Sequence, residues 1–424
     1  MFSLRYSGPM HPNLIVQLLF FIFFAVHLAV ERLLSLANSR YVYAHRGEVP
    51  EPVRDAISPE TYAKSIEYAL ARGRFGHVAA LLAAAETLFF LFSGFIGMFH
   101  EWLRRLQLPD LTDGVVLLIC FMLIRSVLSL PLQLYGTFRL EGRFGFNKTT
   151  PRTFWIDRAK GLLVTMAVGV PFAYGVLAFI MYSGRLWWLW AGLFVIAFQA
   201  AMMVIVPIFI MPLFNKFTPL QEGELKSRLE SLAQACQFAA RGIFVMDGSK
   251  RSAHSNAFFT GLGKSRRIVL FDTLIAQLST EELAAVLAHE IGHYKRKHIV
   301  QWLAVSSFMV LAGFAVLSLL IDEPAIYQAF NVGVQSKAVG LIVFMLIAGD
   351  FTFWVGPLFS ALSRQHEYEA DNYAARQTSP EPMSSALLKL TEKNLGTLKP
   401  HPLYSAYHYS HPTTLERIAA LKGR

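Results

Sequence analysis

The chain has 424 residues, of which 54% are hydrophobic and only 16% carry a charge. This balance is too apolar for an ordinary soluble protein of this length and predicts an integral membrane protein. The formal net charge of +10 would also suit a nucleic-acid-binding protein, but the basic residues are sorted between loops. That sorting is typical of membrane topology, so we expect no nucleic-acid partner.

Seven stretches are long and apolar enough to cross a bilayer, which requires about 20 apolar residues. In chain order they are 13–30, 78–99, 114–134, 161–182, 186–212, 300–320 and 338–360. The first is not expected to be a cleaved signal peptide, because Glu31 and Arg32 follow it directly. Ionisable residues inside or at the ends of spans are costly in lipid, so we expect them to face an interior cavity or one another. They are His27, Glu86, Arg125 and Asp350.

The distribution of Lys and Arg predicts the orientation. Of the 39 Lys and Arg residues, five lie at the N-terminus or in the loops after the second, fourth and sixth spans: Arg5, Arg104, Arg105, Arg185 and Lys337. All the others except Arg125 lie in the remaining loops and the tail. Positively charged loops stay in the cytoplasm, so we expect the N-terminus outside and the C-terminus inside. The polar segments 31–77, 135–160, 213–299 and 361–424 are then cytoplasmic, and together they are large enough for a domain.

A short β pattern follows the fifth span. Residues 243–246 and 267–271 are predicted strands. The run 255–259 lies between them and could supply an edge strand. Such an edge can bind an extended peptide by satisfying its backbone hydrogen bonds, although plain packing of the run against the sheet is equally consistent with the sequence.

A helix with a zinc-binding motif is predicted next. Ser279 and Glu282 form a capping box, and good helix formers follow. His289 and His293 are four residues apart, so both imidazoles project from one face and can reach one zinc ion. Glu290 is displaced by one position and can hold the attacking water. Taken alone, the motif could also be two surface histidines on an amphipathic helix.

A third zinc ligand must come from elsewhere. Only two cysteines are present, which excludes a cysteine-based site, and the metzincin spacing would need a His where the chain has Ile299. The alternative is Glu367 on a second helix, with Asp371 one turn later on the same face to orient a zinc histidine. Glu369 is expected to point away from that face, and Asp350, inside the last span, is a weaker rival.

The C-terminal tail supplies two further candidates. His411 precedes a short helix begun by Pro412 and Thr413 and is free to turn toward the site, where it could donate a hydrogen bond to a developing oxyanion. Arg417 could anchor the tail to one of the two acidic residues of the second helix. The alternative is that both residues only hold the C-terminus on the cytoplasmic domain.

These residues together resemble the type I CAAX prenyl endopeptidases, which are seven-span zinc proteases. The resemblance covers most of the chain and rests on Phe144–Thr149, Pro212–Phe217, Ser252–Phe258, His289–His293, Glu367–Asp371, and Ser410–Pro412 with Arg417. It implies a mainly α, multi-pass membrane fold. Seven transmembrane helices would enclose a chamber, and a cytoplasmic gluzincin-like domain would contain a small β-sheet.

The resemblance also implies the site. One zinc ion per chain would be held by His289, His293 and Glu367, with Glu290 as general base. The substrate would be held by Asn256, Ala257 and Phe258. The implied partners are membrane lipids and a peptide or protein substrate, including lipid-modified or membrane-embedded ones.

The predicted organisation has four segments. Residues 1–212 carry the first five spans and two cytoplasmic loops, 213–299 form the catalytic segment, 300–360 carry the last two spans, and 361–424 supply the third zinc ligand.

The predicted function is a zinc metalloendopeptidase that hydrolyses peptide bonds at the cytoplasmic side of the membrane. Two alternatives remain: an HtpX-like quality-control protease of membrane proteins, and a transporter or inactive scaffold, which only the intramembrane charges favour. The chain ends Leu421-Lys-Gly-Arg424 without a dibasic retrieval signal, so a bacterial inner membrane is the expected location.

Overall fold

The computed structural model describes residues 11–260 and 266–423. Within them, seven helices are long and apolar enough to cross a membrane, which confirms the predicted spans. They are α1 (Pro12–Ala44), α2 (Pro59–Phe92), α4 (Asp110–Leu128), Pro151–Tyr182 (α7 and α8), Gly184–Phe214 (α9 and α10), α14 (His298–Leu320) and Lys337–Gln377 (α16 and α17). Arg5, used above for the orientation, lies outside the described residues.

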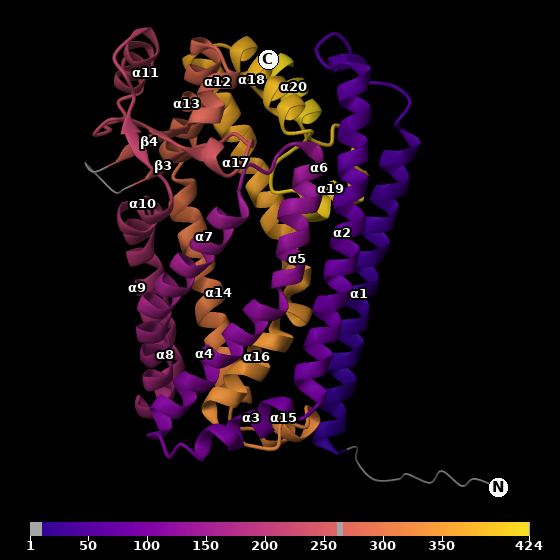
Figure 1. The fold of residues 1–424 in the computed structure, drawn as a ribbon, viewed down its shortest axis with the longest axis vertical. Coiled ribbons are helices and arrows are strands. Elements are labelled where there is room, and N and C mark those ends of the chain that lie inside the picture. The colour runs from indigo at the N-terminus through magenta and orange to yellow at the C-terminus, as the bar shows by residue number, and fades with distance from the viewer. Residues whose placement is uncertain (1–10, 261–265, 424) are drawn as a thin grey trace, which may run out of the picture.

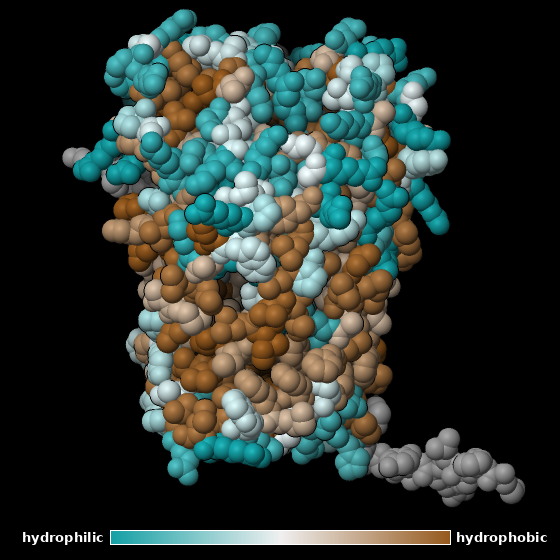
Figure 2. Space-filling model, in the orientation of Figure 1, coloured by the Kyte–Doolittle hydropathy of each residue, from teal (hydrophilic) through white to brown (hydrophobic). Residues whose placement is uncertain are grey.

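Polar and apolar side chains are separated on the surface of the molecule. On the face seen in Figure 2, an apolar band crosses the lower part of the bundle, with a deep polar zone above it and a thin polar rim below. The membrane-spanning helices expose large apolar side chains such as Phe209, Phe308 and Leu319. So much exposed apolar surface is unfavourable in water, and together with the seven apolar helices it indicates the part of the chain that lipid surrounds.

The helices extend further than their apolar stretches. α1 runs past Glu31 to Ala44, and α2 begins at Pro59, where the Ser58 hydroxyl caps it. The segment 31–77, expected as a loop, is therefore mostly helix. These extensions are stable outside lipid because they have their own core, in which Val42 packs with Tyr62 and other apolar residues.

The end of the second span also differs from the prediction. The apolar run 78–99 is divided, because α2 ends at Phe92 and α3 (Phe95–Arg104) follows Gly94, whose φ of 74° favours glycine. α3 then lies with α15 (Pro324–Ala329) across one end of the bundle (Figure 1). A Cβ on Gly97 would lie 2.0 Å from the carbonyl oxygen of Val332, so only glycine permits this approach.

The remaining elements connect these helices or form the polar cap. The connecting helices are α5 (Leu130–Leu134), the π-helical turn η2 (Tyr135–Glu141) and α6 (Gly142–Phe144). Parts of the longer spans are α7 (Pro151–Val164), α8 (Val170–Tyr182), α9 (Trp187–Ile205), α10 (Met211–Phe214), α16 (Lys337–Thr352) and α17 (Gly356–Gln377). The cap contains α11 (Glu224–Ala235), α12 (Asp272–Gln277), α13 (Thr280–Lys295), α18 (Pro380–Lys393), α19 (Pro402–His408) and α20 (Thr414–Lys422).

A four-stranded mixed sheet lies in the cap, with strand order β1-β2-β4-β3. The predicted strands are confirmed as β2 (Ile243–Met246) and β4 (Arg267–Phe271), which pair in parallel. β3 (Ala257–Thr260) pairs antiparallel with β4 and leaves its other side as a sheet edge, as the sequence suggested. β1 (Phe217–Pro219) was not predicted, because three residues carry no periodicity.

The sheet and the cap helices share a core around α13. The Ser279–Glu282 capping box is present, and Glu282 also accepts hydrogen bonds from Ser385 (2.6 Å) and Lys389 (2.8 Å) of α18. Gly292 allows α13 to lie directly on α17, because a Cβ there would be 3.0 Å from the Cα of Ala370. This close contact brings the zinc motif to face the second helix.

Candidate active site

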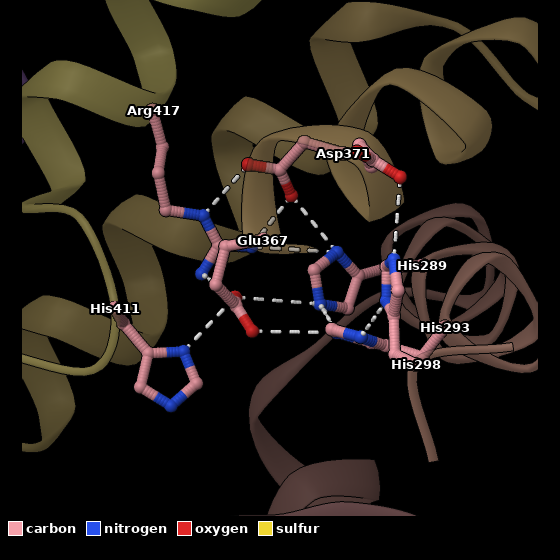
Figure 3. A network of polar contacts seen from close by, with 8 residues as sticks. His289, His293, His298, Glu367, Asp371, His411 and Arg417 are labelled. Carbon is pink, nitrogen blue, oxygen red and sulfur yellow. Dashed lines mark hydrogen bonds and ion pairs between the residues drawn. The ribbon is translucent and has the colours of Figure 1, made fainter. Parts of the chain in front are cut away.

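Three side chains from two helices converge where α13 lies on α17 (Figure 3). The Nε2 atoms of His289 and His293 are 3.1 Å apart. Glu367 of α17 places Oε1 3.3 Å from His293 Nε2 and Oε2 3.6 Å from His289 Nε2. These ligand atoms all lie within 4.8 Å of one another, which is close enough for all of them to reach one ion.

The chemistry of this set suits a cation. Asp371 Oδ1 lies 2.8 Å from His289 Nδ1, and its hydrogen bond to an N–H there leaves Nε2 with its lone pair facing Glu367. Glu367 Oε2 is buried without a well-aligned hydrogen bond among the described residues, although His411 and Arg417 approach it. Two imidazole nitrogens and a carboxylate directed at one point are a ligand set that zinc takes.

Arg417 of α20 joins the two acidic residues from behind. This buried guanidinium donates to Asp371 through Nε (2.7 Å) and Nη2 (2.5 Å), and its Nη1 lies 3.3 Å from Glu367 Oε2. Burial would lower the pKa of Arg417, but the bonds to Asp371 raise it above its ordinary value. The tail is thus fixed to both acidic residues, where the sequence suggested one.

His411 approaches Glu367 from the other side. Its Nδ1 lies 2.9 Å from Glu367 Oε2, while 64% of its side chain is exposed. The residue lies between α19 and α20 and is therefore not held in either helix. It therefore borders both the ligand set and the solvent.

Glu290 follows His289 on α13. Burial raises the pKa of this carboxyl group, and the neighbouring His289 and His293 oppose the shift. A raised pKa lies closer to neutral pH, which suits a carboxyl group that accepts and returns a proton.

The edge strand β3 packs against α13. Asn256 directly precedes the strand, and its side-chain oxygen accepts a hydrogen bond from the Ala257 amide (2.8 Å). Phe258 lies edge-on to Phe271 of β4, with the ring centroids 6.2 Å apart. All three residues proposed to hold a substrate therefore lie at the beginning of the free edge.

Sequence reasoning missed one part of the site. His298 lies beside the motif: its Nδ1 is 2.9 Å from His293 Nδ1, and its Nε2 is 3.3 Å from Glu369 Oε2. Lys297 adopts a left-handed conformation (φ 60°) that turns the chain between α13 and α14 and brings His298 back onto the motif. A His directly after a helix end was the only available signal.

The intramembrane charges lie away from this site and pair with one another. His27 Nδ1 contacts Asp350 Oδ1 at 2.7 Å, and Arg125 Nε contacts Glu86 Oε1 at 2.6 Å. Asp350 is therefore no rival ligand. Glu369 is also outside the ligand set, as expected from its position on α17.

Comparison with known proteins identifies the family. Residues 38–216 match a model described as the CAAX prenyl protease N-terminal domain with five membrane helices, and residues 219–424 match the model of peptidase family M48. The chain belongs to peptidase family M48. A CAAX prenyl protease 1 of Saccharomyces cerevisiae is 38% identical over 97% of this chain and 96% of the relative. A homologue from Homo sapiens is 32% identical over 91% of each chain.

The M48 assignment extends to the three-dimensional structure. A crystal structure of S. mikatae Ste24p matches with a TM-score of 0.91 and 34% identity, and the match covers 98% of this chain and 100% of that one. This M48 protein is thus a multi-pass membrane metalloprotease with seven apolar helices. Membership of the family implies a bound metal ion.

The comparisons also decide between the alternatives. The matches to CAAX prenyl proteases cover nearly the whole chain, so they favour a CAAX-type metalloendopeptidase over an HtpX-like protease. Membership of a peptidase family favours an enzyme over a transporter or an inactive scaffold. The expected bacterial source is not borne out, because the matching relatives named here are eukaryotic.

Proposed function

We propose that this M48 protein is a zinc endopeptidase that cleaves the C-terminal peptide of CAAX-type proteins at the cytoplasmic side of a membrane. The observation that carries the proposal is the convergence of His289, His293 and Glu367 in a chain similar over its length to CAAX prenyl proteases. Such substrates end in a prenylated Cys followed by three residues.

His289, His293 and Glu367 would hold the ion, and Asp371 would keep His289 in the required tautomer through its bond to Nδ1. When bound, zinc supplies Lewis-acid chemistry that lowers the pKa of a water molecule and polarises the scissile carbonyl group. Glu290 would accept the proton from the attacking water and return it to the leaving amine. This assignment gives each group of the motif a separate task.

Two residues of the tail would complete the site. His411 would donate a hydrogen bond to the oxyanion that develops on the scissile carbonyl. Arg417 would position Glu367 and Asp371 through its contacts with both. A peptide would lie along Asn256, Ala257 and Phe258 as an added strand.

Metal content tests the ligand set. We expect about one zinc ion per chain in protein purified without chelators, because the three ligands form a single site with a fourth position left open. Elemental analysis measures the ratio, and replacement of His293 by Ala should lower it strongly. Metal-free protein, or a ratio that this substitution leaves unchanged, would contradict the proposal.

Peptide cleavage tests the substrate class. Purified protein in detergent or liposomes should cleave a farnesylated CAAX peptide and release the last three residues, which mass spectrometry detects. The matched peptide without the farnesyl group shows how much the lipid contributes. If neither peptide is cleaved by zinc-loaded protein, the proposed substrate class is wrong.

The orientation can be tested by labelling cysteines. Lys250 lies in the cap and Glu323 at the opposite end of α14, and both are exposed. In sealed vesicles with the cytoplasmic face outward, an impermeant thiol reagent should label Lys250→Cys and leave Glu323→Cys unlabelled. The parent protein measures the background from its two native cysteines. The reverse pattern would show that the charge bias was misread.

A further inference from the structure

The free edge of β3 is closed at one end by another part of the chain. On the side facing β4, the backbone carbonyl of Asn256 accepts a hydrogen bond from the Phe271 amide (3.1 Å). The backbone carbonyl of His254 accepts one from the Thr273 hydroxyl (3.1 Å). Alternate residues of an extended strand direct their backbone groups to opposite sides. Ser255 and Ala257 therefore face the free edge.

The chain segment 146–148 pairs with the residues that precede β3. The Ala253 amide donates to the Phe146 carbonyl (3.0 Å), and the Lys148 amide donates to the Arg251 carbonyl (3.0 Å). Asn147 and Ser252 form an isolated antiparallel bridge there. A peptide that lies along β3 in this direction would meet the segment 146–148 after a few residues.

A cavity of about 410 Å³ opens at this junction. It is lined by Tyr68, Arg72, Thr137, Glu141, Phe146, Asn147, Thr149, Arg251, Ser252 and His254. Side chains from α2 and η2 therefore lie beside the residues that lead into β3.

The charges of the cavity are paired with one exception. Arg251 donates to both oxygens of Asp157 (2.7 and 3.0 Å). Glu141 accepts from the Tyr68 hydroxyl (2.7 Å), and its other oxygen lies 3.4 Å from His254 Nε2. Arg72 forms no ion pair with a carboxylate of the described residues, and its guanidinium lies 5.5 Å from the centroid of the Tyr68 ring. Its side chain also interacts with the Tyr68 hydroxyl, so of the two arginines that line the cavity it is the one without a carboxylate partner among the described residues.

We infer that this cavity binds the free C-terminal carboxylate of the peptide substrate, with Arg72 as its counter-charge. The inference rests on the proposed function and extends it to the recognition of a chain end. Guanidinium groups suit this task because their paired N–H donors match a carboxylate. Glu141 would repel the ligand, but its oxygens face Tyr68 and His254.

The distances along the strand agree with a three-residue leaving group. A peptide antiparallel to β3 runs with its C-terminus toward His254. If the scissile bond lies near Ala257, three further residues span roughly 10 Å and bring the carboxylate beside His254. A CAAX-type substrate has three residues after the cleavage site, so its end would reach the cavity, where Phe146 and Asn147 form part of the lining.

The test compares two farnesylated peptides of the same sequence, one with a free C-terminal carboxylate and one with an amide. We expect kcat/KM of the parent enzyme to be about tenfold or more higher for the acid peptide than for the amide peptide, mainly because KM is lower for the acid. This is the size of effect expected when the amide peptide loses a partly exposed charged hydrogen bond. Arg72→Gln should bring this ratio close to one, while Arg72→Lys should keep much of it. Arg74→Gln is the matched control, because Arg74 lies on the same helix but not in the cavity, and it should keep the parent ratio.

Three outcomes separate the possibilities. The inference would be overturned if the parent enzyme cleaved the acid and amide peptides with nearly equal kcat/KM. It would also be overturned if Arg72→Gln, with normal zinc content and melting temperature, kept the parent's preference for the acid. Either result would leave the proposed function intact. Cleavage of neither peptide by the parent would instead refute the proposed function. If Arg72→Gln does not fold, the Lys and Ala variants replace it. A preference for the acid peptide that Arg72→Lys keeps and Arg72→Ala loses would support the inference. An equal preference in both variants would overturn it.

Discussion

Replacing Glu290 by Gln is expected to lower kcat for peptide cleavage by about a hundredfold to ten-thousandfold, the contribution typical of a positioned general base. Gln is nearly the same size as Glu but cannot accept a proton from water. The ligand atoms His289 Nε2, His293 Nε2 and Glu367 are unchanged, so zinc should stay bound. Single-turnover cleavage together with elemental analysis measures both properties.

Glu281→Gln is the matched control for this substitution. Glu281 lies in the first turn of the same helix and forms an exposed ion pair with Arg228, which contributes little to stability. This variant should cleave like the parent. Turnover by Glu290→Gln within a few-fold of the parent would show that a different group removes the proton from water.

Replacing His411 by Ala is expected to lower turnover by roughly a hundredfold to a thousandfold, as loss of an oxyanion donor does. The effect should fall on kcat more than on KM, because the oxyanion develops only in the transition state. Zinc content and melting temperature should stay close to the parent, since 64% of the side chain is exposed and supports no core. Steady-state kinetics, metal analysis and thermal unfolding distinguish these effects.

His408→Ala controls for disturbance of the tail. His408 lies three residues earlier, at the end of α19, and approaches Glu31 of α1 at 3.6 Å instead of the site. It should leave kcat largely unchanged. If His411→Ala keeps full activity, or loses zinc and unfolds early, then His411 has a structural role through Glu367 and no part in stabilising the oxyanion.

The site depends on elements that leave the membrane as well as on the cap. α17 and α14 both continue from the apolar part of the bundle into the polar zone, and α17 carries Glu367 and Asp371 there. The tail is tied back to the first span, because the His401 amide donates to Asn38 Oδ1 of α1 (2.9 Å). The position of Glu367, the proposed third zinc ligand, thus depends on the packing of helices that continue into the apolar part of the bundle.

The sequence by itself determined the features that depend on neighbours along the chain. Apolar length predicted the seven spans, because a bilayer fixes the length of a crossing helix. The Ser279–Glu282 capping box and the four-residue spacing of His289 and His293 predicted the motif helix and its ligand face. The short apolar runs in 243–246 and 267–271 predicted two strands that the structure contains.

Only the tertiary structure decided what brings distant segments together. Glu367 reaches the two histidines because Gly292 lets α13 lie on α17, and no local pattern specifies that contact. Arg417 binds both Asp371 and Glu367 only because α20 folds back onto them. Likewise, His298 reaches His293 through one left-handed residue, Lys297, and Arg72 of α2 lines a cavity with residues that precede β3. Local propensity sets the elements, but the free energy of packing between them sets the site.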